Sequence, residues 1–179
     1  LAFLDPTARA GALCGGEASA GGMRAKLMMT AAVLQAAGTP ERAQSPLYDG
    51  LGMVDFKITT SNPLAQRYFN QGLGFAYGFN HAEAGRAFAE AARLDPNLAM
   101  AYWGQALVLG PNINAPMAPE EEPKALAHLK QAQALKAKAS QRERDFIDAR
   151  AARYTGKGED RAAADQAYAG AMRALFQKY

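Results

Sequence analysis

The chain has 179 residues, of which 49% are hydrophobic and 21% charged, which is typical of a globular protein with one core or one short repeat array. Its formal net charge of +3 is small, and no dense Lys/Arg block with interleaved aromatic residues occurs, so a nucleic-acid partner is not expected. No run approaches the ~18 consecutive apolar residues that a membrane-spanning helix needs.

Residues 1–22 form the first distinct segment. They are rich in Gly and Ala, begin without Met and show neither helical nor strand periodicity, so we expect disorder or upstream sequence here. Cys14 lies in this segment and, as the single cysteine of the chain, can close no intrachain disulfide. The fold must therefore be stabilised by packing.

Residues 23–38 have the order of a signal peptide. Arg24 and Lys26 precede an apolar run over residues 27–34, and small residues come next at 36–38. This order predicts export, to the periplasm or out of the cell, with no integral membrane segment left after cleavage. A short amphipathic helix in a cytoplasmic protein is the alternative.

Residues 39–63 differ from the C-terminal part of the chain because prolines and glycines interrupt them. The alternation over residues 53–58 is typical of a strand, yet no second run offers a pairing partner. We expect an extended lead-in arm that lies on the helices.

Residues 64–179 carry helical patterns separated by short breaks, which predicts an all-α fold of about three antiparallel hairpins. Helices are expected over residues 65–77, 81–94 and 99–109, around 125–132, from a Ser140 cap supported by Glu143 to about 154, and over 161–178. The proline-rich residues 110–119 delay the partner helix of the second hairpin.

Residues 65–98 resemble a tetratricopeptide repeat, because two helices and a loop over about 34 residues match its period. The matching positions are Tyr68, Gly72, Phe75, Ala84, Phe88, Ala91 and residues 94–97. Gln71 departs from the pattern, since an aliphatic residue is usual there. The resemblance implies hairpins stacked as a short right-handed superhelix, and the lack of a polar capping helix indicates a fragment of a longer protein.

The wider stretch 48–179 resembles an exported bacterial family of tetratricopeptide proteins that has no settled activity. The segments that carry this resemblance are residues 78–84, 101–104 and 110–117.

In tetratricopeptide arrays the first helix of each hairpin lines a concave surface. By resemblance, the groove-lining residues are Gln66, Phe69, Leu73, Tyr77, Met100, Trp103 and Leu107. The resemblance implies a scaffold that binds a peptide or protein in an apolar, aromatic groove. Packing of the aromatic side chains against missing repeats or the lead-in arm is the competing explanation. The pattern with which such repeats clamp a terminal carboxylate is not reproduced, because Phe69 and Leu73 stand at those positions.

The loop 110–119 is the most distinctive feature outside the repeat. Asn112 and Asn114 offer amides on a proline-stiffened backbone, which suits either recognition of a ligand or fixing of the turn. With His81, the loop supports an alternative function as a small-molecule or metal-dependent enzyme component. Neither metal-ligand spacing nor a phosphate loop nor a nucleophile elbow occurs, so no cofactor, metal or catalytic residue is assigned. A third alternative is a structural oligomerisation module, because an uncovered hairpin can stack on another copy.

Charged residues alternate along the helix that begins after Ser140. Its basic members are Arg142, Arg144 and Arg150, and its acidic members are Asp145 and Asp148. Their helical spacing predicts exposed ion pairs of small individual value.

Overall fold

The computed structural model describes residues 45–52, 54–154 and 161–179. The expectations for residues 1–22 and for the signal peptide at 23–38 lie outside the described residues. Six α-helices and no β-strand occur in the described ranges, so the expected all-α class is confirmed. None of these helices is long and apolar enough to cross a membrane.

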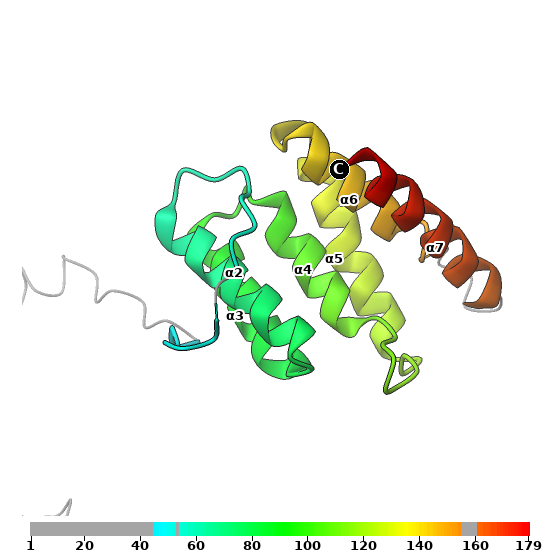
Figure 1. Ribbon diagram of the computed structural model, residues 1–179, viewed down its shortest axis with the longest axis horizontal. Coiled ribbons are helices and arrows are strands. Elements are labelled where there is room, and N and C mark those ends of the chain that lie inside the picture. Colours follow the sequence, from blue (N-terminus) through cyan, green and yellow to red (C-terminus); the bar gives the residue numbers. More distant parts are fainter. Residues whose placement is uncertain (1–44, 53, 155–160) are drawn as a thin grey trace, which may run out of the picture. The chain divides into compact units, whose positions relative to one another are not determined.

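The helices succeed one another as three hairpins (Figure 1). They are α2 (Pro63–Tyr77) with α3 (His81–Leu94), α4 (Ala99–Leu109) with α5 (Glu121–Leu135), and α6 (Gln141–Ala151) with α7 (Arg161–Lys178). A short 3-10 turn, η2 (Lys136–Lys138), joins α5 to α6. Because α3 packs on α4 and both α4 and α5 contact α6, the hairpins stack in chain order.

Side-chain caps explain where α2 and α6 begin. The Asn62 carboxamide oxygen accepts hydrogen bonds from the Leu64 and Ala65 N–H groups at 3.0 and 3.2 Å, so α2 starts at Pro63, two residues before the predicted start. Ser140 and Glu143 form the predicted capping box at the start of α6. That helix ends at Ala151, short of the expected end near residue 154.

The centre of the first two hairpins is the ring of Phe88, which is completely buried. Gly72 of α2 and Gly104 of α4 lie against this ring, and the ring of Phe69 lies 5.5 Å away, centroid to centroid. A Cβ atom at either glycine would stand less than 3 Å from ring carbons of Phe88. The two glycines therefore set how closely α2 and α4 approach α3.

The lead-in arm, residues 45–52 and 54–62, runs along the helices without regular secondary structure. From Val54 to Ile58 it alternates, with Val54, Phe56 and Ile58 turned toward the helices and Asp55 and Lys57 exposed. The alternation of apolar and polar residues, which is typical of a strand, thus reflects packing of every second side chain of the arm on the helices.

Candidate functional site

Most side chains expected to line an open groove are buried. Phe69 and Met100 are fully buried, and Leu73 and Trp103 keep 4% and 5% of their surface exposed. These four side chains belong to the hydrophobic core. A partner would meet none of them without a rearrangement of the segments that cover them.

The arm and α6 supply that cover through a row of aromatic rings. Phe56 of the arm lies 6.0 Å from Phe69 and 5.4 Å from Phe146 of α6, measured between ring centroids. Phe146 in turn stands 5.9 Å from Trp103, whose indole N–H donates to the Phe146 carbonyl at 3.0 Å. Arg142 places its guanidinium 4.4 Å above Phe56 and caps the row.

Gln66, the polar member of the expected groove, binds the backbone of the arm. Its carboxamide oxygen accepts from the Ile58 N–H at 3.0 Å, and its NH₂ donates to the Phe56 carbonyl at 2.9 Å. A carboxamide that both accepts and donates in this way imitates a neighbouring peptide group. The face of α2 therefore holds an extended segment much as a strand would.

Gln71 repeats this arrangement five residues further along α2. It accepts from the Tyr48 N–H at 2.8 Å and donates to the Pro46 carbonyl at 2.9 Å. This bonding gives a physical reason for the glutamine that departs from the repeat pattern.

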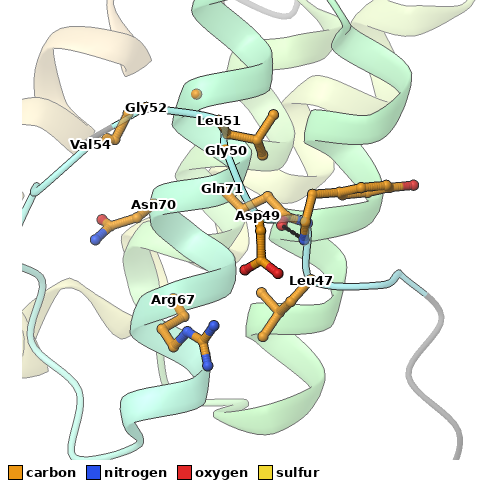
Figure 2. A pocket seen from close by; sticks show the side chains of 11 residues that line it. Leu47, Asp49, Gly50, Leu51, Gly52, Val54, Arg67, Asn70 and Gln71 are labelled. Carbon is orange, nitrogen blue, oxygen red and sulfur yellow. Dashed lines mark hydrogen bonds between the residues drawn. The ribbon is translucent and has the colours of Figure 1, made fainter.

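A cavity of about 260 Å³ lies between the arm and α2, and Figure 2 shows its lining. Asp49 comes from the arm, whereas Arg67 and Asn70 come from α2. The arm bends here through Gly50 and Gly52, whose φ angles of 82° and 80° favour glycine. The shape of this cavity therefore depends on the conformation of the arm.

A second cavity, of about 170 Å³, gathers residues from all three hairpins, and we call it the end pocket. Its lining consists of Ala76, Tyr77, Phe79, His81, Leu107, Pro111, Asn112, Arg150, Arg153 and Tyr168. It unites two expected groove residues, Tyr77 and Leu107, with Asn112 of the loop and with His81. Asn114 does not line it.

Asn112 both fixes the loop and lines the end pocket. Its side-chain oxygen accepts from the Asn114 and Ala115 N–H groups at 2.8 and 3.2 Å, and its backbone forms an isolated bridge with Ala115. This is the turn-fixing role. Asn114 is exposed, as is Ile113 beside it.

Arg150 contradicts the expectation of an exposed ion pair. It is 3% exposed, its Nε atom has no hydrogen-bond partner, and its guanidinium lies 4.7 Å from the Tyr168 ring and 5.5 Å from the Trp103 ring. The carboxylates expected to pair with it bind lysines instead, Asp145 with Lys178 and Asp148 with Lys136. Helical spacing places charges on one helix, but packing against α4 and α7 decides which of them is buried.

Arg153 is held more firmly at the same pocket. Its Nε donates to Asp165 at 2.8 Å, one terminal nitrogen donates to the Pro111 carbonyl at 3.2 Å, and its guanidinium lies 4.9 Å from the Tyr168 ring. Tyr168 therefore lies against both arginines. The sequence offers no signal for this grouping, because Tyr168 and the arginines lie on separate elements.

Phe79 has a left-handed backbone, with φ of 63°, in the turn between α2 and α3. Its side chain is 56% exposed and touches His81 edge-on, with the ring centroids 6.3 Å apart. A left-handed conformation costs a residue with a Cβ atom about 1 kcal/mol. Strain of this kind is common at functional sites.

We expect Phe79→Gly to raise the free energy of unfolding by about 0.5–1 kcal/mol, because glycine adopts this backbone without strain. Urea denaturation followed by circular dichroism measures the change. The control is Phe176→Gly, which changes an exposed aromatic residue inside α7 and should lower stability by about 1 kcal/mol. A loss of stability in Phe79→Gly would instead show that the Phe79 ring makes contacts that stabilise the fold.

Within the described ranges, no group of three or more His, Cys, Asp or Glu residues stands close enough to share a metal ion. Fold and site together define an all-α protein of stacked helical hairpins, in which most of the expected groove residues are buried and an end pocket is present. Comparison with protein families, curated proteins and solved structures finds no match to the chain.

Proposed function

We propose that this chain is an exported tetratricopeptide-type scaffold that binds a peptide or protein partner at the end pocket. The repeat assignment rests on the pattern of residues 65–98 and is supported by the tight hairpin of α2 and α3, where Gly72 lies against Phe88. Export rests on the order of residues 23–38.

The observation that carries the binding proposal is the meeting of Tyr77, Leu107 and Asn112 at one open cavity, while the remaining groove aromatics are buried. Tyr77 and Phe79 expose 74% and 56% of their surface there. Exposed aromatic side chains beside a cavity are the usual anchors of protein recognition. The arm adds support, because it is an extended segment that α2 already binds through Gln66 and Gln71.

Selection of peptides from a displayed library against the full chain tests the proposal. We expect selected peptides to bind about tenfold more weakly to Tyr77→Ser, because an aromatic anchor contributes more than about 1 kcal/mol. Phe176→Ser is the matched control, since it removes an aromatic side chain that is 85% exposed and does not line the end pocket. Equal binding to both variants would contradict the location of the site.

A second candidate is a small-molecule site, with His81 and Asn112 as polar contacts. The observation that favours it is the convergence of these two polar side chains with aromatic ones on the end pocket, whose volume of about 170 Å³ limits a ligand to a compact molecule. Titration with small ligands separates this candidate from peptide binding.

A further inference from the structure

The end pocket contains a buried cation, Arg150, for which the described residues supply no acidic partner. Arg150 is 3% exposed, and its Nε lacks any acceptor. Aromatic rings of Tyr168 and Trp103 lie against the guanidinium, but rings do not accept its N–H donors as oxygen does. Burial lowers the pKa of Arg150, which reflects the cost of keeping this charge away from water.

Among residues 45–52, 54–154 and 161–179, no acidic side chain lines the pocket. The part of the chain that the structure describes contributes two arginines, a histidine and an asparagine to the lining, and no Asp or Glu. Arg153 is already engaged by Asp165 and by the Pro111 carbonyl. In the described part of the chain the Arg150 guanidinium therefore has no counter-charge, and Arg150 lines a cavity that a ligand can enter.

Charge and size indicate the kind of ligand. A single unpaired guanidinium matches a single negative charge, and its planar fork fits the two oxygens of a carboxylate. A phosphate dianion would bring a second charge without a partner. The cavity of about 170 Å³ has aromatic side chains in its lining, including Tyr77, Phe79 and Tyr168, which suits a compact, flat or apolar body.

We infer that the end pocket binds a carboxylate whose oxygens accept hydrogen bonds from Arg150, carried either by a small organic acid or by the terminal residue of a peptide. This inference deepens the proposed function. Where the carboxylate belongs to a peptide, it rests on that proposed function, which supplies the peptide partner. The site at Arg150 is separate from the positions with which tetratricopeptide repeats usually clamp a terminal carboxylate. In this chain Phe69 and Leu73 of α2 stand at those positions.

Isothermal titration calorimetry on the full chain tests the inference with sodium benzoate and with neutral benzamide, which has nearly the same shape. We expect benzoate to bind about tenfold or more tightly than benzamide, because hydrogen bonds to a charged partner are the stronger ones. Equal affinity for the two compounds would overturn the inference. Tighter binding of inorganic phosphate than of benzoate would overturn the choice of a carboxylate.

Two substitutions at Arg150 locate the site. Arg150→Met should weaken benzoate binding about tenfold or more, and Arg150→Lys should have an intermediate effect because it keeps the charge and loses the fork. The control Arg173→Met removes an exposed arginine of α7 that does not line the pocket, and it should leave binding unchanged. Unchanged binding in Arg150→Met would refute the assignment.

Thermal unfolding without ligand separates binding from a structural role. Because an unpaired buried charge is costly, Arg150→Met should keep or raise the unfolding midpoint. A clear fall in that midpoint, together with lost binding, would assign Arg150 to core stacking on Trp103 and Tyr168 and would overturn the inference.

Peptides selected against the chain, made with free and with amidated C-termini, distinguish the two sources. Binding of free-ended peptides alone supports both the scaffold and the carboxylate. Equal binding of free and amidated peptides, without benzoate binding, supports the scaffold proposal and overturns the carboxylate inference. Benzoate binding without any peptide binding supports the carboxylate inference with a small organic acid as the ligand, and it overturns the peptide proposal. Absence of all binding overturns both.

Discussion

Gly104→Ala is expected to lower the free energy of unfolding by about 3 kcal/mol, although alanine is the better helix former by about 1 kcal/mol. The new Cβ atom would stand 2.4 Å from a ring carbon of Phe88. The ring has little room to move away, because it is fully buried and the backbone of Gly72 on α2 lies against it. The helices must separate, which opens voids in a close-packed core.

Urea denaturation measures this loss, and two further variants identify its cause. Gly170→Ala in α7 is the matched control, because nothing lies within 4 Å of its Cβ position, and it should stabilise the protein by about 0.5–1 kcal/mol. Adding Phe88→Leu to Gly104→Ala should cost less than the sum of the two single changes, because the smaller side chain relieves the clash. Stabilisation by Gly104→Ala itself would show that the ring is free to move.

Glu143→Ala is expected to lower the free energy of unfolding by about 3 kcal/mol. Glu143 is 2% exposed, and its carboxylate accepts from the Thr59 N–H and the Ser140 N–H, both at 2.7 Å, and from the Thr59 hydroxyl. The residue thus closes the cap of α6 and also fastens the arm to that helix. Its removal leaves donors without acceptors at both places.

Chemical denaturation gives the size of this effect, and amide hydrogen exchange gives its location. We expect faster exchange at Thr59 and at neighbouring arm residues, because the Thr59 N–H loses its acceptor and the arm is held less firmly on the helices. The control is Glu121→Ala, which breaks the ion pair with Lys124 on the surface of α5 and should cost no more than about 0.5 kcal/mol. A similar small cost for Glu143→Ala would mean that the arm is held by its apolar side chains alone.

The helices can be predicted because their signals are local. The predicted bounds 81–94, 99–109 and 161–178 agree with α3, α4 and α7. Caps, breakers and one apolar face per helix act within a few residues, so neighbouring positions contain the information. The late start of α5 after the proline-rich loop is also confirmed, with Ala125, Leu129 and Ala132 buried as expected.

The sequence leaves two explanations open for the expected groove residues, binding of a partner and packing against the lead-in arm, because the choice depends on contacts between distant residues. The structure shows packing by the arm and α6. Nothing local indicates that Phe56 packs between Phe69 and Phe146, or that Gln66 and Gln71 bind the arm.

The end pocket is predictable only in part, for the same reason. The sequence points to Tyr77, Leu107 and Asn112 one by one but not to their meeting at one cavity. Arg150 is expected at the surface, whereas the structure buries it.

The sequence by itself determined the all-α class, the order of the hairpins and most helix bounds, because these depend on the spacing of apolar residues and on caps next to them. Only the tertiary structure decided which faces are covered and which charge is buried. Burial depends on the neighbours that packing supplies, and for Arg150 those neighbours are Trp103 on α4 and Tyr168 on α7.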